Sequence, residues 1–157
     1  LGRKPAGEAN GFTASYEMIY EPGELLAVSY TAGAETGRFV LKTADAAVEL
    51  QVTVEGETLR ADGEDLAFVT VRLTDKEGVE NLYAEKEITV TVEGAGTLQG
   101  FGSADPRAIG SYDSVTWKTY DGYVMAVIRA GAEAGEIRVK FAAEGCETQE
   151  VVIHTEK

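Results

Sequence analysis

The sequence predicts an all-β fold: an immunoglobulin-like β-sandwich preceded by the last strands of a second, truncated sandwich. Three observations carry this prediction. Apolar and polar residues alternate with a period of two in several short segments. Turn-forming residues separate these segments, and 18 glycines are available for tight turns. Val and Thr, which favour strands over helices, recur throughout the chain.

The clearest strand covers residues 48–54, where four apolar residues alternate with polar ones and therefore share one face. The segment 66–75 alternates as well, and either Phe68 or Val69 leads the set of residues that faces the core. Further strands are expected at residues 87–92, 96–100, 123–129, 136–142 and 149–153. Seven short strands joined by turns are typical of an immunoglobulin-like sandwich.

The first 43 residues contain three expected strands, at residues 13–20, 23–30 and 37–42. Three strands are too few to close a sandwich. They either extend the main domain or belong to a preceding sandwich, and we favour the second interpretation. The chain begins without Met, so we expect an excised fragment.

This interpretation divides the chain into residues 1–43, the incomplete end of one immunoglobulin-like domain, and residues 44–157, a complete one. Charge supports the boundary, because the first part has four basic and five acidic residues, whereas the second has ten and 22. An incomplete sandwich exposes a strand edge, so we expect the excised fragment to form an edge-strand dimer.

Composition also excludes several functions. With 14 basic and 27 acidic residues, the net charge of −13 repels nucleic acids and anionic lipid surfaces. No apolar run reaches the roughly 20 residues that span a bilayer. The single cysteine excludes an internal disulfide, and no pattern predicts a cofactor.

The longest segment without alternation, residues 103–122, carries the candidate site. Tyr112, Trp117 and Tyr120 lie in it, and Tyr123 follows directly. Flat aromatic rings with polar edges suit the apolar faces of sugars, so these four residues are candidates for sugar binding. The alternative is that they pack beneath the loop or against a neighbouring domain.

Asp62, Asp65 and Asp75 form a weaker candidate, a calcium site built from carboxylate oxygens. Their spacing does not match an EF-hand loop, and turns with solvated charges explain the same residues. No paired histidines or cysteines suggest another metal site.

Several segments, in order, resemble the C-terminal region of bacterial glycoside hydrolase family 2 enzymes of the β-galactosidase-like group. Residues 20–25 read Tyr-Glu-Pro-Gly-Glu-Leu, and residues 27–30 read Ala-Val-Ser-Tyr. Residues 59–71 resemble the start of the family's C-terminal domain. Residues 96–106, Gly-Thr-Leu-Gln-Gly-Phe-Gly-Ser-Ala-Asp-Pro, and residues 122–130 continue the match.

The resemblance implies a non-catalytic accessory region that supports a catalytic (β/α)₈ barrel. Such parents hydrolyse β-galactosides with two carboxylates on the barrel, with retention of configuration, and none of the barrel motifs is present here. The implied partners are the other domains of the parent, with carbohydrate as a second candidate. The rival is an independent carbohydrate-binding or adhesive module. A bacterial parent, periplasmic or secreted, fits the resemblance, although the sequence leaves the compartment open.

Overall fold

Strands dominate the structure, a computed structural model that describes all residues from 1 to 157. The residues form two units, Leu1–Lys42 and Thr43–Lys157. No helix in the chain is long and apolar enough to cross a lipid bilayer.

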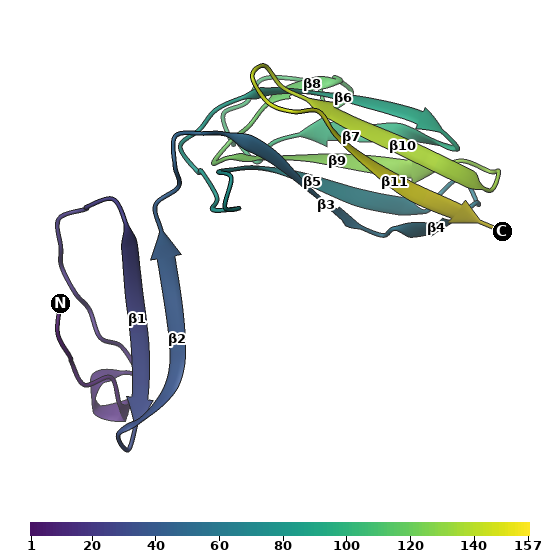
Figure 1. The fold of residues 1–157 in the computed structure, drawn as a ribbon. Coiled ribbons are helices and arrows are strands. Elements are labelled where there is room, and N and C mark those ends of the chain that lie inside the picture. The colour runs from purple at the N-terminus through teal and green to yellow at the C-terminus, as the bar shows by residue number, and fades with distance from the viewer. The chain divides into compact units, whose positions relative to one another are not determined.

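The first unit, Leu1–Lys42, contains one antiparallel hairpin, formed by β1 (Glu24–Thr31) and β2 (Ala34–Lys42) (Figure 1). Ala32 and Gly33 join the strands, both with positive φ, which is the geometry of a tight hairpin turn. A short 3₁₀ helix, η1 (Glu8–Asn10), lies before the hairpin. No residue of this unit is buried.

The strand expected at residues 13–20 is wrong, because this segment forms no strand. A strand exists through its hydrogen bonds to a neighbour, and β1 and β2 pair only with each other. The first unit therefore has two strands rather than three.

The second unit contains two sheets stacked face to face (Figure 1). The four-stranded sheet is antiparallel and has the order β3 (Glu49–Glu55), β5 (Leu66–Thr74), β9 (Tyr123–Ala130), β7 (Gly96–Gly102). The five-stranded sheet has the order β4 (Thr58–Arg60), β11 (Gln149–Glu156), β10 (Gly135–Ala142), β6 (Glu87–Gly94), β8 (Thr116–Lys118). Only the β11–β4 pair is parallel.

This arrangement confirms the all-β sandwich and the seven strands that alternation predicted. Two strands of three residues each, β4 and β8, were not expected, because three residues are too few to show a period of two.

The core lies between the two sheets, where every second residue of the central strands is buried. On β5 the buried set includes Val69, whereas Phe68 is exposed, which decides between the two candidates. Phe101 and Phe141, both buried, face each other across the core with ring centroids 6.3 Å apart. Each such side chain contributes about 1.5–3 kcal/mol through burial, so this interior accounts for most of the unit's stability.

Candidate functional site

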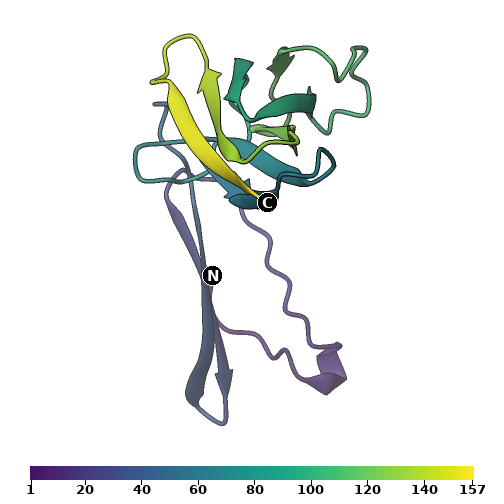
Figure 2. The same ribbon diagram turned by 90° about the vertical axis from the view of Figure 1, so that its right-hand side faces the viewer.

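The segment between β7 and β9 projects from the sandwich as a long loop, drawn in green in Figure 2. Its first turn is fixed by Asp105, whose carboxylate accepts a 2.9 Å hydrogen bond from the Arg107 N–H and pairs with the Arg107 side chain. The backbone hydrogen bond is the main reason why the pKa of Asp105 lies below its ordinary value. Further along, the Phe101 N–H donates to the Tyr112 carbonyl at 2.7 Å, which ties the loop back to β7.

Trp117 is positioned by β8, which pairs with the start of β6 so that Trp117 lies opposite Ile88. Its indole N–H donates to the Ser103 hydroxyl at 3.0 Å. The Tyr112 ring stacks on the indole, with centroids 5.3 Å apart and an interplanar angle of 14°. Trp117 is therefore half-buried, with its one hydrogen-bond donor satisfied within the domain.

Two glycines make room for this aromatic pair. A Cβ at Gly102 would lie 2.4 Å from two carbon atoms of the Tyr112 ring. A Cβ at Gly110 would lie 2.6 Å from the Trp117 indole. Real Cβ atoms do not approach so closely, so the Tyr112 ring lies directly on the backbone of β7, and the loop backbone lies directly against Trp117.

Tyr120 and Tyr123 flank a two-residue turn, Asp121 and Gly122, in which both φ angles are positive. The two tyrosines exchange backbone hydrogen bonds of 3.0 and 2.9 Å across this turn. The Asp-Gly pair is a strong turn signal in the sequence, and it could have predicted this close pairing.

Tyr123 has its own polar partners, away from the stacked pair. Its hydroxyl donates to the Glu80 carboxylate at 2.5 Å, and the Arg72 guanidinium lies 5.5 Å from its ring centroid. The hydrogen bond to Glu80 and, secondarily, burial raise the pKa of Tyr123 above its ordinary value near 10. Tyr123 is thus held as a neutral hydrogen-bond donor at physiological pH.

Two hollows lie on either side of the stacked pair. The larger, about 730 Å³, is bordered by residues of the 82–87 and 103–121 segments, including Trp117 and Tyr120, and we call it the loop cleft. Its lining is mixed, with a Glu85–Lys118 ion pair beside aromatic and hydroxyl groups.

The smaller hollow, about 320 Å³, lies on the outer surface of the four-stranded sheet, and we call it the Tyr112 hollow. Its lining is almost wholly apolar and includes Thr70, Gly102, Ala104, Tyr112, Met125 and Val127. Ser103 lines both hollows, so the two are neighbours.

The four predicted aromatic residues therefore do not form one flat platform. Tyr112 and Trp117 stack on each other, Tyr120 borders the loop cleft, and Tyr123 borders the Tyr112 hollow. Their placement divides the candidate site into a polar cleft and an apolar hollow.

Sequence reasoning missed several residues of these surfaces. Met125 lies on β9 between two buried residues, so it points outward, and Phe68 has the same position on β5. Their signal was present in the sequence as apolar residues out of phase with the core set. Tyr83 and Ile109, both fully exposed, lie in connecting segments where no periodicity marks them.

The structure does not bring Asp62, Asp65 and Asp75 together as a calcium site. Asp65 directly precedes β5 and Asp75 directly follows it, so the nine-residue strand separates them by about 30 Å. No group of three or more potential metal-binding side chains occurs anywhere in residues 1–157.

Each of these carboxylates instead holds a turn. Asp62 accepts hydrogen bonds of 2.9 Å from the N–H groups of Glu64 and Asp65, with Glu64 making the largest contribution to its lowered pKa. The pKa of Asp65 is lowered chiefly by the Arg60 N–H, at 2.9 Å. Asp75, which is buried, accepts from Glu77 and Val79 at 2.9 Å each.

Comparisons with known proteins give a consistent result. Residues 50–152 match the family model described as glycoside hydrolase family 2 C-terminal domain 5. A glycosyl hydrolase family 2 member from Bacteroides cellulosilyticus is similar over the whole chain, with a TM-score of 0.95 and 30% identity. A second such structure, from strain DSM 14838 of that species, matches 98% of the chain with a TM-score of 0.92 and 31% identity.

Among curated proteins, beta-galactosidase BoGH2A of Bacteroides ovatus is 26% identical over 131 residues, which is 83% of this chain. All three relatives are much longer. This chain covers 20% and 21% of the two solved structures and 15% of the β-galactosidase.

Proposed function

The chain belongs to glycoside hydrolase family 2, as a C-terminal domain of such an enzyme, and on this premise we propose that it is a non-catalytic accessory region that supports the catalytic part. The observation that carries the proposal is the length of the relatives, of which this chain corresponds to only 15–21%. A stable sandwich with a disulfide-free core is a suitable rigid block for that role.

The parent enzyme hydrolyses O-glycosyl bonds of β-galactosides in this proposal. The β-galactosidase relative supports the substrate class. The reaction requires two carboxyl groups about 5–5.5 Å apart for a retaining mechanism, one of them an acid with a raised pKa.

The carboxylates of this chain favour a structural role. Asp62, Asp65 and Asp105 all have lowered pKa values, the direction opposite to that needed in a general acid, because backbone N–H groups stabilise their charged forms. These residues stabilise turns, and we assign the reacting pair to another part of the parent.

We assign the first unit to the end of a preceding immunoglobulin-like domain. Its hairpin exposes apolar side chains on both faces, including Leu26, Phe39 and Leu41, with 50%, 66% and 56% of their surface exposed. An isolated two-stranded hairpin is marginally stable at best, so these residues fit a sheet that further strands complete.

Two assays test the accessory role. The isolated chain is expected to release no product from aryl β-galactosides under conditions where the whole enzyme turns over. Deleting the chain from the whole enzyme is expected to lower the melting temperature of the remainder by several degrees. Turnover by the isolated chain, or an unchanged melting temperature after deletion, contradicts the proposal.

The loop cleft gives the rival function, sugar binding, a specific test, because Trp117 is the chain's one tryptophan and borders the cleft. Titration of the isolated chain with galactosides and longer oligosaccharides is followed by Trp117 fluorescence. The accessory role predicts no saturable change at millimolar sugar. A saturable change that Tyr120→Ala abolishes, while the fold is retained, would establish a carbohydrate-binding module.

A further inference from the structure

The second unit exposes large apolar side chains in two places. Among its exposed large apolar residues, Leu82, Tyr83, Ile109, Tyr112 and Val115 belong to the 82–83 and 109–115 segments, and the remaining two, Phe68 and Met125, project from the outer face of the four-stranded sheet. Monomeric proteins rarely expose contiguous apolar surface, and such patches mark interaction sites.

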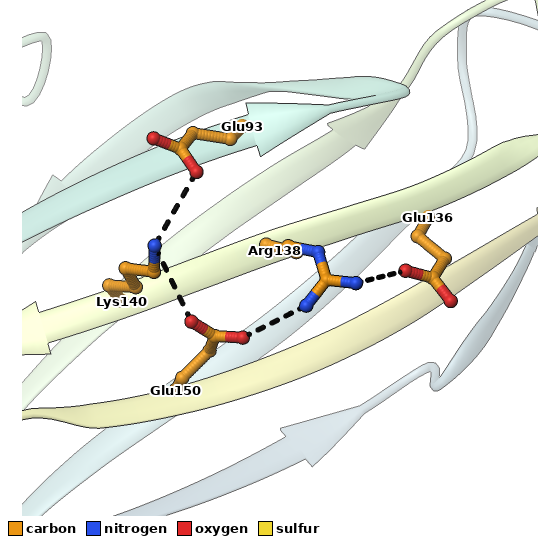
Figure 3. A network of polar contacts seen from close by, with 5 residues as sticks. All are labelled: Glu93, Glu136, Arg138, Lys140 and Glu150. Atoms are coloured by element: carbon orange, nitrogen blue, oxygen red, sulfur yellow. Dashed lines mark hydrogen bonds and ion pairs between the residues drawn. The ribbon is translucent and has the colours of Figure 1, made fainter.

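The outer face of the five-stranded sheet has the opposite character. On β10, Lys140 pairs with Glu93 of β6 and Glu150 of β11, and Arg138 pairs with Glu150 and with Glu136 of its own strand (Figure 3). This face is suited to water.

The Tyr112 hollow is the most sharply shaped part of the apolar region. Its floor lies over β7, where Gly100 and Gly102 carry no side chain on this face, and Tyr112 forms a wall. Met125 and Val127 of β9 form the other side. At about 320 Å³, the hollow equals the volume of roughly ten water molecules, which is enough for whole apolar side chains.

The chemistry of this region favours a protein over a sugar. Its exposed members are three aliphatic residues and Met125 alongside three aromatic residues, Phe68, Tyr83 and Tyr112. Tyr112 stacks on one face of the Trp117 indole, so that face is closed to a sugar ring. Projecting aliphatic and aromatic side chains in a shaped hollow are typical anchors of protein interfaces.

The length of the relatives indicates which protein is available. Solved structures that match this chain with TM-scores of 0.95 and 0.92 contain about five times as many residues. In a chain of that length, other folded domains are tethered beside this one at high effective concentration.

We propose that the Tyr112 hollow and the exposed residues around it dock another folded domain of the same enzyme chain. That domain inserts an apolar side chain into the hollow. This inference rests on the proposed function. The second unit has ten basic and 22 acidic residues, net −12, so we expect the facing surface of that domain to carry basic residues around its apolar anchor.

Methionine oxidation tests this proposal without any substitution in the hollow. The Met125 side chain is 45% exposed in the chain described here, and oxidation of its thioether by hydrogen peroxide depends on access. Mass spectrometry follows sulfoxide formation at Met125 in the isolated chain and in the whole enzyme. We expect Met125 to oxidise about tenfold more slowly in the whole enzyme, because the docked domain covers it.

A matched control uses the opposite face. Thr91 is exposed on β6, in the five-stranded sheet, and the methionine of a Thr91→Met variant should oxidise equally fast in both forms. Equal rates for Met125 in both forms overturn the proposal. If protection in the isolated chain rises with its own concentration, the occupant is a second copy. If oligosaccharides protect Met125, the occupant is a sugar. Either result also overturns the proposal.

The deletion experiment separates this inference from the proposed function. If deletion lowers the melting temperature but Met125 is oxidised equally fast in the whole enzyme, the accessory role stands, but the docking site has been assigned to the wrong surface. If deletion leaves the melting temperature unchanged, the accessory role itself fails.

Discussion

The outer faces of the two sheets differ in chemistry around β10 of the five-stranded sheet and around Met125 of the four-stranded sheet. On the five-stranded sheet, Arg138 contacts Glu136 and Glu150, with N–O distances of 2.6 and 3.3 Å, and Lys140 lies 3.5 Å from both Glu93 and Glu150 (Figure 3). On the four-stranded sheet, the corresponding outward positions include Phe68 and Met125, and an apolar hollow lies beside them.

This difference shows how one fold can separate solubility from association. Both sheets bury their inner faces in the same core. A polar residue on either inner face would therefore lower the stability of the domain. The outer positions are free of that requirement. Ion pairs on an outer face favour contact with water, whereas a large exposed apolar patch marks an interaction site.

We expect the largest loss of stability from a substitution at the corner that joins the two sheets. Gly94 ends β6 before the chain crosses to β7, with φ of +98° and a would-be Cβ 2.1 Å from the Glu136 carbonyl oxygen. Gly94→Ala is expected to destabilise the domain by about 3 kcal/mol or more, because backbone strain and a backbone clash act together. Urea unfolding followed by Trp117 fluorescence measures this effect.

Gly63→Ala is the matched control for Gly94→Ala. Gly63 also has a positive φ, +78°, but a Cβ there meets no atom within 4 Å. Its substitution should cost only about 1 kcal/mol, from the backbone conformation alone. If the two substitutions lower the free energy of unfolding equally, small movements of the backbone around Gly94 must relieve the clash.

A substitution at Gly102 tests the packing of Tyr112 beside the hollow. Gly102→Ala places a methyl group where the Tyr112 ring lies, so the ring must leave its stack on Trp117. We expect a destabilisation of about 1–3 kcal/mol and a change in Trp117 fluorescence of the folded state.

The control for Gly102→Ala lies two residues earlier on the same strand. A Cβ at Gly100 would make an ordinary contact of 3.8 Å with Tyr112. Gly100→Ala should therefore change stability by less than about 0.5 kcal/mol. If Gly102→Ala leaves the fluorescence unchanged, the stack does not depend on the missing side chain.

A substitution at Arg138 removes its ion pairs with two glutamates on the five-stranded sheet. Because these groups are half-exposed, Arg138→Ala should cost only about 0.5–1 kcal/mol, and the loss should shrink at high salt. Urea unfolding at low and at high NaCl measures both. Arg129→Ala is the control, since Arg129 is exposed on β9 of the other sheet and makes no ion pair. If Arg138→Ala lowers stability equally at low and high salt, the contribution of Arg138 comes from packing of its aliphatic carbons rather than from its ion pairs.

The smallest expected effect concerns Tyr123 at the rim of the apolar face. Its pKa is raised in the folded state, so the stability from its hydrogen bond to Glu80 is fully present below pH 10 and is lost as the pH rises through the folded pKa. Absorbance of the phenolate near 295 nm should show a tyrosine that titrates above pH 10.

Glu80→Gln should lower the midpoint of that titration, because an amide accepts a weaker hydrogen bond and carries no charge. Tyr123→Phe should remove the part of the absorbance change that occurs at the highest pH, which would assign that part to Tyr123. A titration curve that is identical in all three proteins would contradict the role of Glu80.

Patterns in the sequence predicted the sandwich, its main strands and its family. Alternation identified the long strands because each has one face in the core, and residues such as Val69 and Leu50 repeat at intervals of two. The ordered resemblance to glycoside hydrolase family 2 is confirmed by the family match over residues 50–152. These signals are local in the chain, so the sequence displays them directly.

Which residues meet at the surface depends on the three-dimensional fold. The sequence placed Tyr112, Trp117, Tyr120 and Tyr123 in one group, but β8 and β9 belong to different sheets and separate them into two hollows. It also grouped Asp75 with Asp62, although a whole strand lies between them. Contacts between distant segments depend on strand pairing and on space left by glycines such as Gly102, and neither is visible in local periodicity.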